Sequence, residues 1–219
     1  MTDKIDKYLT KKPFITKKNT KHHQKNSQKP SQVRIIGGQY KRRLVSFIEA
    51  DGLRPTPDRL RETIFNWLLA DIHDALVLDV CAGSGVLGFE ALSRGAKCVT
   101  MIEKNIKQID ELTKSINLLN IHQNSLTLIH GCAEEVLKTL DTPFDVIFLD
   151  PPYSLDLWAT LLNGIIDSHL YHNDSLIYIE SDKPLELCVQ GIDVTFVKRT
   201  KIGQVYAGII KINARFIKK

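Results

Sequence analysis

The sequence is poor in cysteine and has no long apolar run. Its four cysteines (Cys81, Cys98, Cys132 and Cys188) and its seven histidines are scattered without the spacing of a metal site. No apolar stretch is long enough to span a bilayer. The Lys-rich start is not followed by the apolar segment of a signal peptide. We therefore expect a cytoplasmic protein with reduced thiols, no metal and no membrane attachment.

Acidic residues are scarce at the amino-terminal end. Residues 1–48 contain 13 Lys or Arg and two Asp, which gives a net charge of about +11. The net charge of the whole chain is +5. The part of the chain after Ile48 is therefore mildly acidic, with a net charge of about −6. Residues 1–32 also have few apolar side chains, which predicts a disordered basic tail. A second basic cluster, Lys41-Arg42-Arg43, favours an arm that contacts a phosphate backbone over a mere solubility tail.

Strand-like and helix-like segments alternate through most of the chain. We expect strands at 76–80, 98–102, 125–130, 144–149 and 175–180, and helices at 58–68, 86–95, 106–119, 133–140 and 157–170. Asp58 is the expected N-cap of the first helix. Two further strands, 194–200 and 204–212, are close enough to form an antiparallel hairpin.

This alternation predicts a doubly wound, Rossmann-like α/β sheet that is mostly parallel, with one antiparallel strand from the C-terminal hairpin. The expected domain spans residues 58–219. Residues 33–57 precede it as a β-hairpin (33–48, turning at Gly37-Gly38) and a rigid connector.

A glycine-rich turn follows the strand at 76–80. Gly83, Gly85 and Gly88 match the pattern G-x-G-x-x-G between a strand and a helix, where glycines let the backbone approach a nucleotide-like ligand closely. Glu103 ends the next strand twenty positions after Gly83, where an acid typically accepts the ribose hydroxyls. Both nicotinamide enzymes and methyltransferases that use S-adenosylmethionine share this pattern.

The segment Asp150-Pro151-Pro152-Tyr153 favours the methyltransferases. Two prolines cannot continue the preceding buried strand, so they hold the Asp150 carboxylate as a fixed acceptor with an aromatic ring three positions on. Such a site suits a planar base that bears an exocyclic amine. Asp79, just before the glycines, also suits a cationic sulfonium better than a pyrophosphate. An oxidoreductase that uses NAD and a non-catalytic RNA-binding protein are weaker alternatives.

The chain resembles the bacterial 16S rRNA (guanine(966)-N(2))-methyltransferase family from Val33 onward. The block Arg54-Pro55-Thr56 to Asn66-Trp67-Leu68 is the most specific part of the match, whereas Asp150 to Tyr153 is shared with other amino-directed methylases, including adenine methylases of DNA or RNA. The matching segments are residues 34–38, 52–68, the glycine loop with 90–96, 148–153 and 176–181.

The resemblance implies methyl transfer from S-adenosylmethionine to a guanine N2 amine of 16S rRNA, either free or within an assembled small subunit, by an enzyme that we expect to be a monomer. The implied catalytic residues are Asp150, Pro151, Pro152 and Tyr153. The implied cofactor-binding residues are Asp79, Ala82, Gly83, Ser84, Gly85, Leu87, Gly88, Glu103, Lys104, Cys132, Ala133 and Asp150. The expected RNA-binding residues are Arg34, Lys41, Arg42, Arg43, Arg54, Thr56, Arg61, Glu62 and Asn66.

Where the family often has an acid or amide for the adenine amino group, this chain has Cys132-Ala133, so we expect a backbone acceptor there.

Overall fold

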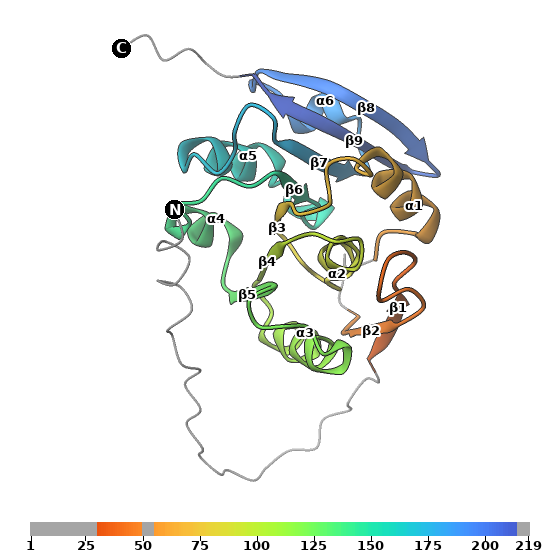
Figure 1. The fold of residues 1–219 in the computed structure, drawn as a ribbon. Helices are drawn as coiled ribbons and strands as arrows, with labels where there is room; N and C mark the ends of the chain where they lie inside the picture. Colours follow the sequence, from red (N-terminus) through yellow and green to blue (C-terminus); the bar gives the residue numbers. More distant parts are fainter. Residues whose placement is uncertain (1–29, 50–54, 214–219) are drawn as a thin grey trace.

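The computed structural model describes residues 30–49 and 55–213. Residues 1–29 of the expected tail lie outside this range, as does Arg54 of the expected RNA-binding set. In the described part, a large sheet lies between two layers of helices, with a smaller hairpin beside it (Figure 1). None of the helices in these residues has the length and apolar character needed to cross a membrane.

The large sheet has seven strands in the order β5-β4-β3-β6-β7-β9-β8. In that order the strands are Leu126–His130, Cys98–Glu103, Leu76–Asp79, Val146–Leu149, Leu176–Ser181, Val205–Ile212 and Val194–Ile202. The first five strands are parallel, and β9 is antiparallel to both β7 and β8. This arrangement confirms the expected fold class. The chain changes direction across the sheet between β3 and β6, the kind of switch point where open α/β sheets bind ligands.

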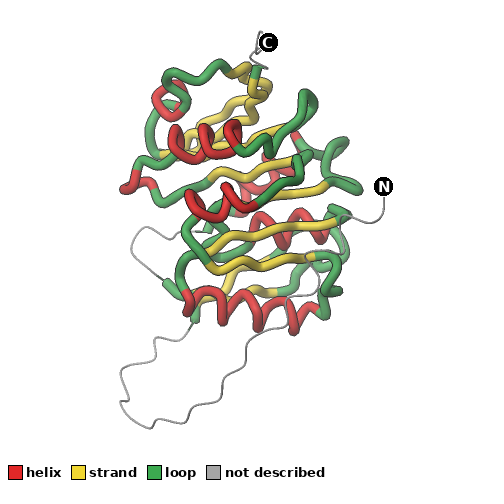
Figure 2. The backbone as a smooth tube through the Cα atoms, turned by 90° about the vertical axis from the view of Figure 1, so that its left-hand side faces the viewer, coloured by secondary structure: helices red, strands yellow, loops and turns green. Residues whose placement is uncertain are grey.

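Apolar clusters cover both faces of the sheet, and Figure 2 shows the backbone of the strands with the helices packed around them. Every residue of β6 and β7 is buried, which explains why these strands appear in the sequence as continuous apolar runs. One face packs against α1 (Asp58–Trp67), α2 (Val86–Ser93) and α3 (Ile106–Leu119), and the other against α4 (Ala133–Val136), α5 (Trp158–Asp167) and α6 (Leu185–Cys188).

The N-terminal hairpin pairs β1 (Ser31–Arg34) with β2 (Leu44–Phe47) and is fixed to α2. The Glu90 carboxylate accepts hydrogen bonds from the backbone N–H groups of Ile36 and Gly37, at 2.9 and 2.7 Å. Gly38 has a φ of +69°, and a Cβ there would lie 1.7 Å from the carbonyl oxygen of Ser93. Only glycine therefore permits this close approach of the turn to α2.

Three details of the expected elements were wrong. The N-cap of α1 is Pro57, and Asp58 instead bonds to Arg34 and Arg61. The helix expected at 133–140 is α-helical only over Ala133–Val136 and continues as a 3₁₀ turn, Leu137–Thr139. The short helix α6 was missed, although Pro184 and a buried pair at i and i+3, Leu185 and Cys188, were a signal for it.

Candidate active site

The glycine-rich loop joins β3 to α2 at the carboxyl edge of the sheet. Gly83 and Gly85 have φ values of 51° and 72°, which side chains disfavour. A Cβ on Gly85 would lie 2.4 Å from Leu112 of α3, and one on Gly88 would lie 2.3 Å from Met101 of β4. The loop thus needs its glycines both for the turn and for the packing of α2 against its neighbours.

Other expected loop residues turn their side chains inward. Ala82, Ser84 and Leu87 are all buried, whereas Gly83 is only half-buried. We infer that the loop contacts a ligand mainly through its backbone at Gly83.

Glu103 ties the loop to the end of β4. Its two carboxylate oxygens accept hydrogen bonds from the backbone N–H groups of Gly83 at 2.9 Å and Asn105 at 2.7 Å. Each oxygen keeps further lone pairs, so this carboxylate can also accept hydroxyl groups of a ligand. Its orientation is therefore fixed before a ligand binds.

We expect Glu103→Ala to weaken binding of S-adenosylmethionine by about 1–3 kcal/mol, because the ribose hydroxyls lose their paired acceptor. Calorimetry measures this directly. Glu135→Ala removes an exposed glutamate on α4 and serves as the matched control. An affinity for Glu103→Ala equal to that of the control would remove Glu103 from the site.

Asp79 is a buried carboxylate at the end of β3. It is 2% exposed, and its Oδ2 accepts a hydrogen bond from the backbone N–H of Gly88 at 3.3 Å. Burial, aided by the charge of Glu103, raises the pKa of Asp79 to about 7, although the Gly88 hydrogen bond opposes the shift. A cation placed beside Asp79 would favour its ionised form.

Several carboxylates gather around the start of the loop. Burial raises the pKa of the Cys81 thiol, and so do the nearby charges of Asp79, Asp150, Glu103 and Glu134. Cys81 is therefore a neutral thiol and no activated nucleophile. Burial raises the pKa of both Asp79 and Asp150, so a cationic ligand at this edge would favour their ionised forms, whereas a pyrophosphate would oppose them.

The raised pKa of Asp79 predicts that cofactor binding depends on pH. Above about 7 Asp79 is ionised and attracts the cationic cofactor, whereas below that value the cofactor must displace a proton. Affinity should therefore fall by up to about tenfold per pH unit as the pH drops below about 7. Titrations with S-adenosylmethionine measure this, with neutral adenosine as the control ligand. Asp79→Asn should flatten the profile, and an unchanged profile in that variant would contradict the assignment.

Asp150 follows β6, on the other side of the switch point from the glycine loop. Burial raises the pKa of Asp150 above its usual range, and so do the charges of Glu180 and Asp79. Pro151 is buried, and Pro152 and Tyr153 are half-buried. The structure thus brings the four expected catalytic positions to the same edge as Asp79.

Glu180 is a site residue that we missed. This 3%-exposed acid accepts hydrogen bonds from the hydroxyls of Tyr153 at 2.9 Å, Tyr178 at 2.7 Å and Thr56 at 3.2 Å. Its backbone carbonyl accepts the indole N–H of Trp158 at 2.8 Å, and the Trp158 ring lies 5.9 Å from that of Tyr153. Glu180 therefore fixes the orientation of Tyr153. An acid at the end of a buried strand was the available signal.

The expected adenine-binding position lies at the start of α4. Cys132 is exposed and caps the helix, and its carbonyl already accepts the N–H groups of Glu135 and Val136. Ala133 is buried, and Lys104 is exposed beyond β4. A backbone acceptor at Cys132 is thus partly occupied. Half-buried Glu134 is the nearest acid to this position in the sequence.

The expected RNA-binding residues fall into two groups. Lys41, Arg42 and Arg43 are exposed on the hairpin, although Arg43 also donates to the carbonyl of Leu118 at 2.8 Å. Arg34 is exposed too and pairs with Asp58. On α1, Glu62 and Asn66 are exposed.

Thr56 and Arg61 form the second group and require correction. Thr56 is 3% exposed and bonds to Glu180, so it belongs to the wall of the site. Arg61 is fully buried, where it donates to the carbonyls of Thr56 and Arg34 and pairs with Glu90 and Asp58. Both residues support the architecture, because tertiary packing buries them, whereas Glu62 and Asn66 stay exposed on α1.

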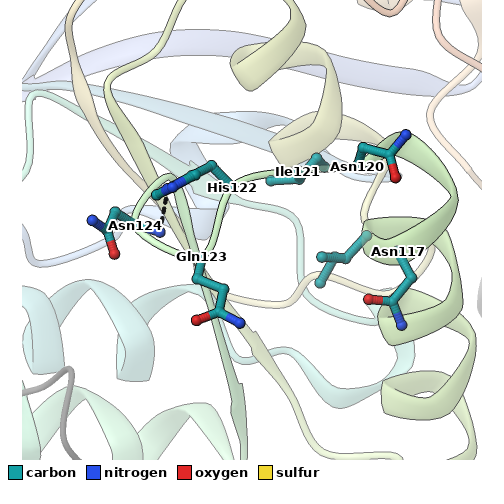
Figure 3. Close-up of a pocket in the computed structure, with 7 residues that line it drawn as sticks. Asn117, Asn120, Ile121, His122, Gln123 and Asn124 are labelled. Atoms are coloured by element: carbon teal, nitrogen blue, oxygen red, sulfur yellow. Dashed lines mark hydrogen bonds between the residues drawn. The ribbon is translucent and has the colours of Figure 1, made fainter.

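A cavity of about 460 Å³ lies elsewhere, between the end of α3 and β5 (Figure 3). The segment that lines the cavity precedes β5, whereas Asp79 and Asp150 lie at the ends of their strands. The cavity is therefore at the opposite edge of the sheet and is separate from the candidate site. It is lined by Ile116, Asn117, Asn120, Ile121, His122, Gln123 and Asn124. In residues 30–49 and 55–213, no His, Cys, Asp and Glu side chains group as a metal site requires.

Comparison with known proteins agrees with this geometry. The family model "Conserved hypothetical protein 95" matches residues 33–211. The chain is 40% identical over 157 residues to ribosomal RNA small subunit methyltransferase D of Escherichia coli K12, which covers 72% of this chain and 78% of that protein. The Haemophilus influenzae protein of the same name is also 40% identical, over 158 residues, covering 70% of this chain and 82% of the relative. A solved structure of an Escherichia coli methyltransferase, yhhF, matches with a TM-score of 0.75 and 36% identity, over 84% of this chain and 100% of that one. The chain therefore belongs to this family of small-subunit ribosomal RNA methyltransferases, as its sequence motifs indicated.

Proposed function

We propose that the protein transfers a methyl group from S-adenosylmethionine to the exocyclic N2 amine of a guanine in 16S rRNA. The observation that carries this proposal is the position of Asp150 to Tyr153 opposite the glycine loop, across the switch point of the sheet. Family membership supports the RNA substrate.

The residues around the loop fit the cofactor. When bound, S-adenosylmethionine supplies a methyl group on a positively charged sulfur. Asp79 and Glu103 line the loop with negative charge, and the Asp79 carboxyl, with its pKa near 7, gains stability as an anion beside a cation. Glu103 is oriented to accept ribose hydroxyls, and the Gly83 backbone can lie against the ligand.

Asp150 and the carbonyl of Pro151 act on the target base. The exocyclic nitrogen of guanine is a poor nucleophile because its lone pair is delocalised into the ring. Acceptors for both N–H hydrogens would favour a tetrahedral nitrogen whose lone pair points at the methyl group, mainly through positioning and electrostatics. As the new N–C bond formed, the nitrogen would become acidic and its proton would be lost to water, so Asp150 need only accept a hydrogen bond from it. A strong base is therefore unnecessary.

Tyr153 provides a surface on which the target base stacks after it leaves its helix or loop. Glu180 holds the Tyr153 hydroxyl, and Trp158 lies beside the ring, so that little orientational freedom is lost when the base arrives. The exposed residues of the N-terminal hairpin, Lys41, Arg42 and Arg43, would contact RNA phosphates. Exposed Arg34, Glu62 and Asn66 would also contact the RNA. We expect the enzyme to act as a monomer.

A panel of nucleic acids tests this function. We expect labelled methyl groups to pass from S-adenosylmethionine to 16S rRNA, free or within the small subunit, and to neither 23S rRNA nor duplex DNA. Preferred transfer to DNA or 23S rRNA would contradict the proposed substrate.

A further inference from the structure

The β8–β9 hairpin is unlike the rest of the acidic body in its charge. Residues 194–212 contain four Lys or Arg and no acid, whereas the chain after Ile48 carries about −6 overall. Lys198, Arg199 and Lys201 are all exposed on the edge strand β8. Arg199 also pairs with Glu186 of α6 at 2.6 Å, whereas Lys201 has no acidic partner among the described residues. This concentration of positive charge indicates a surface for a polyanion.

The strand register places the tip of this hairpin at the catalytic edge. Tyr206 of β9 pairs with Ser181, the last residue of β7, and Lys201 of β8 pairs with Tyr206. Two strand spacings, about 10 Å, therefore separate the backbones of Lys201 and Ser181. Ser181 directly follows Glu180, which holds Tyr153. Figure 1 shows the tip of the hairpin beside α1.

Aromatic rings accompany the cations along this path. The Lys183 ammonium pairs with Asp156 at 2.5 Å and lies 5.0 Å from the ring centre of Trp158, which packs beside Tyr153. The Lys201 ammonium lies 4.2 Å from the ring centre of Tyr206 and donates to its hydroxyl. On the same face of the hairpin, the Arg199 guanidinium lies 4.8 Å from the ring centre of Phe196. Trp158 is buried, but the half-buried rings of Phe196 and Tyr206 lie among exposed cations. Such a surface suits an RNA strand, because cations contact its phosphates and rings contact its bases.

We propose that Lys183, Arg199 and Lys201, with Tyr206, form a second RNA-binding surface. It holds the rRNA strand on the side of the target base opposite the N-terminal hairpin. This inference rests on the proposed function. The protein would then bind the RNA strand on both sides of the base that stacks on Tyr153. These contacts would fix the position of that base over Asp150.

The hairpin itself provides matched controls. Lys198 points to the opposite face, because it pairs with Ile209 whereas Arg199 pairs with Gly208. Lys211 lies on β9 five residues beyond Tyr206, about 17 Å along the strand towards the other edge of the sheet. Substitution of either lysine changes the charge of the same hairpin without touching the proposed surface.

The test measures 16S rRNA affinity against salt concentration for Arg199→Ala/Lys201→Ala and for Lys201→Gln alone, with Lys198→Ala and Lys211→Ala as controls. For each phosphate that the protein no longer neutralises, the slope of log affinity against log salt should fall by about 0.7–0.9. We expect the slope to fall by about twice this amount in the double variant and by about this amount in Lys201→Gln. We expect no change of slope in the controls. Unchanged affinity for S-adenosylmethionine verifies that each variant is folded.

Wild-type slopes in both Arg199→Ala/Lys201→Ala and Lys201→Gln, with 16S rRNA still methylated by the wild-type protein, would overturn the second surface and leave the proposed function intact. Slopes reduced equally in the controls would also overturn it, since net charge alone would then explain the change. Failure of the wild-type protein to methylate 16S rRNA would contradict the proposed function instead.

Discussion

Asp150→Ala should lower the rate of methyl transfer at saturating substrates by about 10²–10³-fold, the usual cost of losing one pre-oriented polar group that acts in the transition state. Cofactor binding should persist, because the glycine loop and Glu103 lie on other strands. Asp150→Asn keeps a carbonyl oxygen that accepts an N–H hydrogen, so it should retain more activity than the alanine variant.

Single-turnover rates, with S-adenosylmethionine affinity measured in parallel, test the role of Asp150. Asp141→Ala removes an exposed aspartate just before the same strand and is the control. Near-normal turnover of Asp150→Ala would contradict its catalytic role. An inactive Asp150→Asn would show that a full negative charge is needed and that acceptance of a hydrogen bond is insufficient.

Arg61→Ala should lower the free energy of unfolding by about 3–5 kcal/mol, because it leaves buried carboxylate and carbonyl partners unpaired. The Arg61 side chain is fully buried and bonds to Glu90, which in turn holds the backbone of the N-terminal hairpin. This one guanidinium therefore connects α1, α2 and the hairpin.

Urea unfolding of Arg61→Ala beside Arg59→Ala measures this contribution. Arg59 is exposed on the same helix, so its loss should cost no more than about 0.5 kcal/mol. If Arg61→Ala unfolded like the wild-type protein and instead bound RNA weakly, the RNA-contact role expected from the sequence would stand.

Local patterns were sufficient to predict much of the fold and the site. The helix expected at 106–119 is α3, since its apolar period is regular and Asn105 and Asn120 cap its two ends. The glycine loop and the Asp150 turn could be predicted from the sequence because both depend on backbone rules for glycine and proline that need no knowledge of neighbours.

Long-range contacts explain what could not be predicted. Arg61 and Thr56 look like surface residues next to a helix start, and only the packing of β7 and α2 against them makes them interior. Tyr178 shares a strand face with Glu180, but Thr56 and Tyr153 come from distant segments, so nothing local in the sequence indicates that these two meet it.

The most direct test of the central claim is the identity of the methylated nucleoside. 16S rRNA labelled by the protein with S-adenosylmethionine is digested and its nucleosides are separated. The account predicts that the label is in N2-methylguanosine and that Asp150→Ala removes it. Label in a methylated adenosine, or in a guanosine methylated on a ring nitrogen, would contradict the account.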